Sequence, residues 1–257
     1  MIRTETRGYV LEVTIDRPDA MNALSPEMSR DLSAVLSDFE ENDDLRVLLV
    51  TGAGDRAFCA GADLGRMEQT LEGSHGDVAH PREESVPFWE VNVTKPIVAA
   101  INGHCLAAGL GLALLTDVRI AAENATFGCM GTVRGIVPGA GQTQRLVRQI
   151  GHVNAMWLLL SGERIDANEA LRMGLVNKVA PQASVISLAR EAADFLASRA
   201  PLAVRAAKRA ALRGAELPLV AGLRVEAELA APVRQSEDAR EGIRAFMERR
   251  PPEFRGR

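Results

Sequence analysis

Residues 95–115 read KPIVAAINGHCLAAGLGLALL. The apolar run Pro96–Ile101 predicts a buried strand, because it is short and ends at the turn-forming pair Asn102-Gly103. Small and apolar residues continue through Ala107–Leu115 and predict a helix. A buried strand that leads through a short loop into a helix is typical of α/β proteins, so this stretch predicts an α/β fold.

The chain before this stretch has the same design. Alternation of apolar and polar residues across Tyr9–Ile15 predicts a half-buried strand. Ser25-Pro26-Glu27 then predicts the start of a helix, since Ser is a favoured cap and Pro fits the first helical position. The apolar run Val47–Val50 predicts a further buried strand. Strands therefore concentrate in the first two-thirds of the chain.

The last third is predicted to be helical. Asp166 and Glu169 form a capping box, and Gly174 is the expected end of that helix. From Val185 to Met247 the pattern is helical and rich in Ala, Leu and Arg. The expected breaks in this region are Pro201, Gly214 and Pro232.

Composition excludes several classes of protein. The 257 residues carry 30 basic and 34 acidic side chains, a net charge of −4, and only 4% are aromatic, which argues against a nucleic-acid partner. The chain begins without the apolar segment of a secretory signal, and its longest apolar stretch is too short to cross a bilayer. Its three cysteines have no CxxC spacing, which favours reduced thiols. We therefore expect a cytoplasmic protein with no membrane partner.

Two short segments are candidates for the chemistry. Phe58–Leu64 (FCAGADL) follows a buried strand and a glycine turn, and Ala107–Gly111 (AAGLG) opens a helix. Small residues let a ligand approach the backbone, and two N–H groups that converge on one oxygen form an oxyanion hole. The same small residues also suit tight packing of strand on helix, so the spacing alone leaves both interpretations open.

Other cofactor sites receive little support. Gly109-Leu110-Gly111 suggests a dinucleotide loop, but the third glycine of G-x-G-x-x-G is replaced by Leu114. An NAD-dependent oxidoreductase is thus a distant alternative. The four histidines have no metal-ligand spacing; they are His75, His80, His104 and His152.

The chain resembles the enoyl-CoA hydratase/isomerase (crotonase) superfamily over nearly its whole length. The combination and order of the matching segments are specific, whereas any one of them alone is not. In chain order these segments are Arg17–Leu24, Val50–Gly52, Phe58–Leu64, Lys95–Gly103, Ala107–Gly109, Asp117, Ala125–Gly128, Pro138–Gly141 and Thr143–Leu146.

The resemblance implies a crotonase-like spiral of β-β-α turns followed by a helical C-terminal region. It divides the chain into a core at 1–195, which holds the thioester site, and a helical oligomerisation region at 196–257. It further implies a homotrimer or a dimer of trimers. The substrate is an acyl-CoA thioester, coenzyme A being part of the substrate, with no separate cofactor and no metal.

The resemblance also assigns site residues. The thioester carbonyl accepts hydrogen bonds from the backbone N–H groups of Ala62 and Ala108. The segments Ala20–Leu24 and Ala60–Gly65 line the coenzyme A side. The substrate-binding residues expected on this basis are Ala20, Leu24, Ala60, Ala62, Asp63, Leu64, Gly65 and Ala108.

The chain departs from the family where hydratases carry two glutamates that move protons and hold water. The first glutamate position is Gly111 and the second is Gly131, while an acid used by some relatives would fall at Gly139. A positioned acid or base contributes about 10²–10⁴-fold to the rate, so we expect hydration to be very slow. Replacement acids could come from the loop Glu72–Pro87, although such charged loops are usually only solvated. Its candidates are His75, His80, Glu83 and Glu84.

These observations predict an acyl-CoA-processing lyase or isomerase that stabilises a thioester enolate. One alternative is a decarboxylase, hydrolase or lyase of the same superfamily, since loss of CO₂ itself supplies a carbanion. A second alternative belongs to another class: a non-catalytic protein that binds fatty acyl-CoA.

Overall fold

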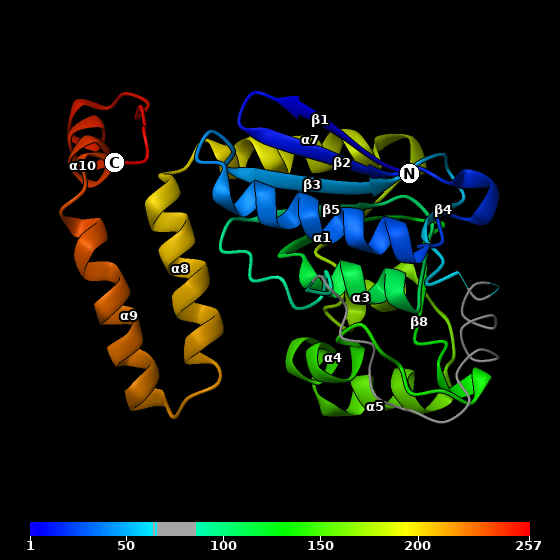
Figure 1. The fold of residues 1–257 in the computed structure, drawn as a ribbon. Helices are drawn as coiled ribbons and strands as arrows, with labels where there is room; N and C mark the ends of the chain where they lie inside the picture. Colours follow the sequence, from blue (N-terminus) through cyan, green and yellow to red (C-terminus); the bar gives the residue numbers. More distant parts are fainter. Residues whose placement is uncertain (64, 66–85) are drawn as a thin grey trace.

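The computed structural model describes residues 1–63, 65 and 86–257. Its centre is a six-stranded sheet (Figure 1) with the strand order β1 (Ile2–Arg7), β2 (Val10–Ile15), β3 (Val47–Gly52), β5 (Ile97–Ile101), β7 (Val118–Ala122) and β10 (Lys178–Ala180). β1 pairs antiparallel with β2, and the other neighbours are parallel. The strand predicted from alternation is confirmed as β2, and the two predicted from apolar runs are confirmed as β3 and β5.

A second, four-stranded sheet contains the strands β4 (Ala57–Cys59), β6 (His104–Leu106), β8 (Thr126–Gly128) and β9 (Ile165–Asp166). Each of β3, β5 and β7 in the first sheet is followed along the chain by one of β4, β6 and β8 in the second. β6 then leads into helix α3 (Ala108–Leu115). This succession of long strand, short strand and helix is the predicted β-β-α spiral.

Helices cover both faces of the large sheet. α1 (Pro26–Glu41) begins as predicted, with Ser25 capping the N–H of Met28, and it packs on one face (Figure 1). α7 (Val185–Ala197) covers the opposite face with a row of buried alanines. In the described part of the core, the remaining helices are α4 (Gln142–Ile150), α5 (His152–Ser161) and α6 (Ala167–Arg172). Short 3₁₀ turns occur at Pro18–Ala20, Thr132–Arg134 and Gln182–Ser184. Asp166 caps α6 through the N–H of Glu169, as the capping box predicts.

The chain ends in α8 (Pro201–Gly214), α9 (Leu219–Arg234) and α10 (Glu237–Glu248). α8 and α9 form an antiparallel hairpin that extends away from the sheet (Figure 1). The predicted breaks at Pro201 and Gly214 are confirmed, but the break at Pro232 is wrong, because Pro232 lies inside α9. It stands in the last turn, where a proline removes one N–H bond shortly before the helix ends at Arg234.

The proposed boundary between core and C-terminal region, 195/196, falls in the last turn of α7. The division into a core at 1–195 and an oligomerisation region at 196–257 stays a prediction.

Candidate functional site

Ala62 follows β4 and pairs with Leu24 in a single parallel β-bridge. The N–H of Leu24 donates to the carbonyl of Gly61 at 2.8 Å, and the N–H of Asp63 donates to the carbonyl of Leu24 at 2.9 Å. In a parallel bridge these two bonds use the groups on either side of Ala62, so the N–H of Ala62 itself faces away from Leu24. It has no hydrogen-bond partner among the residues that the structure describes.

Ala108 is the first residue of α3, where helical N–H groups have no partner within the helix. The preceding residue, Ala107, has the unusual dihedrals φ 49° and ψ −122°, and its N–H donates to the carbonyl of Gly128 at 2.9 Å. No side chain caps this helix. The N–H of Ala108 is therefore available at the positive end of the helix dipole.

Two glycines let these segments touch. β4 and β6 are parallel neighbours, so the residues after them lie side by side. A methyl carbon placed on Gly61 would lie 2.8 Å from the Cβ of Ala107 and 3.5 Å from the nitrogen of Ala108. One placed on Gly109 would lie 2.1 Å from the carbonyl oxygen of Cys59. The small residues thus serve tight packing and, by the same contacts, bring Ala62 close to Ala108.

An ion pair ties the segment before α1 to Asp63, the residue after Ala62. Arg17 contacts Asp63 at 2.7 Å, and the backbone N–H of Arg17 donates to the side chain of Asn22. Asn22 is buried and donates to the carbonyls of Ala53 and Ala57 at 2.9 and 2.7 Å. Arg17 and Asn22 were not among the predicted site residues, although both lie in the matching segment Arg17–Leu24.

The two glutamate positions are covered by the backbone of one loop. A methyl carbon on Gly111 would lie 2.5 Å from the carbonyl oxygen of Ala140, and one on Gly131 would lie 2.7 Å from the nitrogen of Pro138. Both distances are too short for a real side chain. The third position, Gly139, is exposed and meets nothing within 4 Å. The loop from Ile136 to Ala140 therefore occupies space that larger side chains at 111 and 131 would need.

The other predicted site residues are placed as follows. Leu24 is buried, Ala20 and Ala60 are half-buried, and Gly65 is exposed. Some predicted residues lie outside the described part of the chain: Leu64, and the candidates of the loop Glu72–Pro87, which are His75, His80, Glu83 and Glu84.

The cysteines are buried free thiols. Burial raises the pKa of Cys59 and of Cys129 to about 12, and burial likewise raises the pKa of Cys105. A thiol with so high a pKa stays protonated and is a poor nucleophile or metal ligand. Among the residues described, no group of His, Cys, Asp or Glu is arranged to hold a metal, and no helix is long and apolar enough to cross a membrane.

Comparison with known proteins agrees with this fold. The family model for enoyl-CoA hydratase/isomerase matches residues 5–257. (E)-benzylidenesuccinyl-CoA hydratase of Thauera aromatica is 40% identical over 255 residues, which cover 99% of both chains. Short-chain-enoyl-CoA hydratase of Clostridium acetobutylicum is 37% identical, with 96% of this chain and 94% of that one covered.

Solved structures are similarly close. Enoyl-CoA hydratase from Bacillus anthracis has a TM-score of 0.91 at 38% identity, and the match covers 100% of this chain and 99% of that one. Enoyl-CoA hydratase from Mycobacterium tuberculosis H37Rv gives 0.91 at 34% identity with the same coverage. The chain belongs to the enoyl-CoA hydratase/isomerase family of the crotonase superfamily, whose members process acyl-CoA.

Proposed function

We propose that this protein binds an acyl-CoA thioester and polarises its carbonyl with the backbone N–H groups of Ala62 and Ala108. The observation that carries the proposal is a pair of backbone N–H groups, after the neighbouring strands β4 and β6, that have no hydrogen-bond partner in the part of the chain that the structure describes. Donors held in advance where negative charge develops stabilise an enolate or a tetrahedral anion. From the family resemblance we further propose that Ala20, Leu24, Ala60, Asp63, Leu64 and Gly65 line the coenzyme A side, with no further cofactor.

Hydration is proposed to be slow. Positions 111 and 131 carry no ionisable group, and the loop Ile136–Ala140 lies against both. A hydratase needs a base that holds the attacking water and an acid that protonates the α-carbon. The similarity to hydratases therefore identifies the family of this chain. The reaction that it catalyses is inferred from the residues at its own site.

Enolate chemistry without those acids stays available. When a malonyl-type thioester loses CO₂, the bond between the α-carbon and the carboxylate breaks, and its electron pair delocalises onto the thioester oxygen. Ala62 and Ala108 would stabilise that oxygen, and solvent would protonate the carbanion. The packed glycines equally favour a second candidate, a protein that binds fatty acyl-CoA without turning it over.

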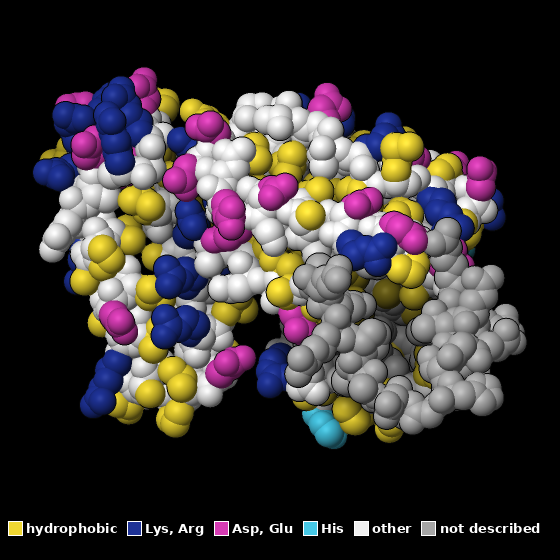
Figure 2. Space-filling view, viewed as in Figure 1, with side chains coloured by type: hydrophobic (Ala, Val, Ile, Leu, Met, Phe, Trp, Pro, Cys, Tyr) yellow, Lys and Arg dark blue, Asp and Glu magenta, His cyan; other side chains and the backbone are white. Residues whose placement is uncertain are grey.

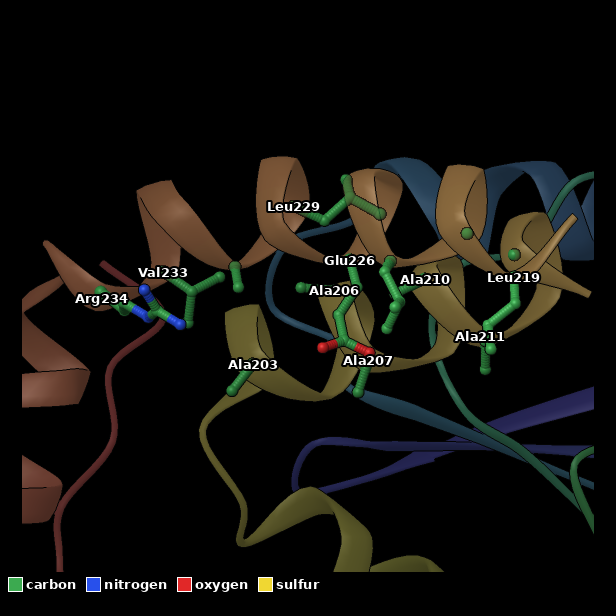
Figure 3. A pocket seen from close by; sticks show the side chains of 14 residues that line it. Ala203, Ala206, Ala207, Ala210, Ala211, Leu219, Glu226, Leu229, Val233 and Arg234 are labelled. Atoms are coloured by element: carbon green, nitrogen blue, oxygen red, sulfur yellow. The ribbon is translucent and has the colours of Figure 1, made fainter. Parts of the chain in front are cut away.

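The C-terminal hairpin supports self-association. Neither α8 nor α9 has a buried residue. Between them lies an apolar groove of about 580 Å³, with Ala207 and Ala210 on one helix and Leu229 and Val233 on the other (Figure 3). Helices with an exposed apolar face are stable only when another element covers it. We propose that a second copy does so, in a homotrimer or a dimer of trimers.

The test is a mass-spectrometric screen of acyl-CoA thioesters for binding and for conversion. Conversion of any thioester supports the enzyme, whereas tight binding with no conversion supports the non-catalytic alternative. With crotonyl-CoA, hydration should fall orders of magnitude below a typical turnover of about 10 s⁻¹. Failure to bind any acyl-CoA would contradict both.

Removal of one donor tests the site itself. In an Ala108→Pro variant the N–H is gone, and conversion should drop about 10²–10³-fold, the scale for loss of one oxyanion donor. Proline suits the first position of a helix, but Ala107 has unusual dihedrals, so folding is checked by oligomer size and thermal midpoint. Full activity in a folded variant would show that the carbonyl is polarised elsewhere.

A further inference from the structure

A second cavity lies at the edge of the large sheet opposite Ala62 and Ala108. It has a volume of about 400 Å³, and its walls include the residues just before β2, β3 and β5, namely Tyr9, Arg46 and Pro96. The start of α8 and the C-terminal tail complete it. The tail crosses close to α8, since a methyl carbon on Gly256 would lie 3.2 Å from the ring of Pro201.

The lining of this cavity is cationic, although the whole chain has a net charge of −4. Its carboxylates are Asp43 and Asp44. Its cations come from four separate parts of the chain and are Arg46, Lys95, Arg199, Arg205 and Arg255. Basic side chains also gather over the neighbouring α10 and the tail (Figure 2). Several fixed cations in one concave site create a positive potential that attracts anions.

Three of these arginines are not neutralised by a carboxylate within the described part of the chain. Arg46 donates to the carbonyls of Ala197 and Phe254 at 3.1 and 2.8 Å and lies 3.9 Å above the ring of Tyr9, all neutral partners. Arg199 stacks on the ring of Phe195 at 3.9 Å, and neither Arg199 nor Arg255 forms an ion pair with a residue that the structure describes. These side chains keep N–H donors and charge for a ligand.

The remaining two cations add to the field of the cavity. Arg205 is partly neutralised by Glu40 at 3.0 Å and by Asp43, a residue of the cavity lining, at 3.6 Å. Lys95 is buried, and its Nζ donates to the carbonyls of Phe39 and Asn42 at 2.7 and 2.6 Å. Burial, and then the charge of Arg205, lower the pKa of Lys95. A bound anion nearby would relieve this cost.

We infer that the cavity binds a phosphate group, either as free phosphate or as part of a phosphate ester. Arginine presents planar, paired N–H donors that match phosphate oxygens, and here arginines approach from the chain before β3, the chain before α8 and the tail. The start of α8, which no side chain caps, adds partial positive charge. The site is separate from the proposed thioester site, and neither depends on the other.

The test uses the full-length protein and inorganic phosphate. Binding is followed by the line width of the ³¹P signal and by the rise of the thermal midpoint, with sodium chloride at matched ionic strength as the reference. We expect saturable binding that is weakened about tenfold or more in an Arg199→Ala/Arg255→Ala double variant, the scale for loss of charged hydrogen bonds. Arg209→Ala is the matched control, since Arg209 is an exposed residue of α8 outside the cavity. It should bind as the unaltered protein does.

Competition distinguishes the two sources of phosphate. If adenosine 3′,5′-bisphosphate displaces inorganic phosphate, the site is assigned to a nucleotide. If it does not, the site is assigned to free phosphate. The inference is overturned if phosphate does not bind, if chloride gives the same stabilisation, or if the double variant binds phosphate as tightly as Arg209→Ala does. A thermal midpoint without phosphate shows that each variant is folded.

Discussion

At Ala62 and Ala108 the groups proposed to contact the substrate are peptide N–H groups, so on this proposal the side chains contribute by being small. What fixes the two donors is the surrounding backbone: the bridge between Leu24 and Ala62, and the contacts that only Gly61 and Gly109 allow. Substitution at a glycine should therefore disturb the site more than substitution at either alanine by a similar residue.

Gly111→Ala tests how tightly the loop closes on the helix. Alanine favours a helix by about 1 kcal/mol over glycine, but the new methyl carbon would lie 2.5 Å from the carbonyl oxygen of Ala140, a backbone atom that cannot rotate away. Overpacking of this kind costs about 1–3 kcal/mol, so we expect a net loss of stability in urea unfolding.

Gly139→Ala is the matched control in the same loop. The new methyl carbon would have no atom of the described residues within 4 Å, and the stability of this variant should stay within about 0.5 kcal/mol of that of the unaltered protein. Equal stabilities for the two variants would show that the loop does not press on position 111.

Residues of this site differ in how far sequence predicts them. The two segments of small residues that contain Ala62 and Ala108 are candidates from the sequence pattern, and the resemblance to the crotonase superfamily then selects these two residues within them. The partnership of Arg17 with Asp63, 46 positions away in the chain, depends on how two loops meet in space. The closeness of Ala140 to Gly111 has no local signal either, because it arises from the packing of a loop on α3.

At the scale of elements, α8 is attached to the core by a small charged network. Lys208 contacts Asp117 at 2.7 Å, and Arg205 contacts Glu40 at 3.0 Å. Burial by itself raises the pKa of Glu40, but hydrogen bonds from Thr94 and Lys95 and the charge of Arg205 outweigh it and leave that pKa below its usual value. Glu40 thus joins α1, the chain before β5 and α8.

This network predicts a pH-dependent stability. Because the pKa of Glu40 is lower in the folded protein than its ordinary value of 4.5, its carboxylate stabilises the fold above that value. The contribution is lost as the pH falls through the folded pKa. Glu40→Gln should lower the free energy of unfolding by about 1 kcal/mol near neutral pH, and by less at about pH 3.

Urea unfolding at the two pH values measures the effect. Glu41→Gln is the control, since Glu41 is exposed and has no ion pair with any residue the structure describes. This role for the carboxylate would be contradicted if Glu40→Gln and the unaltered protein differed in free energy of unfolding by the same amount at both pH values.

Helices are predicted correctly where the hydrophobic pattern and a capping residue mark the same start. The short strands are not predicted. Ser25 and Asp166 mark the starts of α1 and α6, because their side chains bond the first turn. β4, β6 and β8 have three residues each, too few to show a periodicity, and they exist because neighbours in the second sheet pair with them. β1, exposed along most of its length, also has no apolar pattern.

At the scale of the molecule, the hairpin of α8 and α9 leaves large apolar side chains exposed. Leu219, Val220 and Leu223 are 76, 65 and 52% exposed. We predict that the protein is a trimer or a hexamer, because a second copy can cover the apolar face of α8 and α9. Light scattering should therefore give the mass of three or six chains. Leu223→Glu should shift the mass toward a single chain, because burying a carboxylate without a partner is costly. A monomer of unaltered protein at micromolar concentration would refute this.

We predict that a bound thioester carbonyl accepts two hydrogen bonds, from the backbone N–H groups of Ala62 and Ala108. Infrared difference spectroscopy of an acyl-CoA with a ¹³C-labelled thioester carbonyl observes that bond directly, whether or not the ligand is turned over. Two donors withdraw electron density from the carbonyl and weaken its double bond, so the labelled band should lie at lower frequency in the complex than in water. In folded Ala108→Pro the band should move back toward its position in water. A band at the solution frequency in the complex with the unaltered protein would contradict the account.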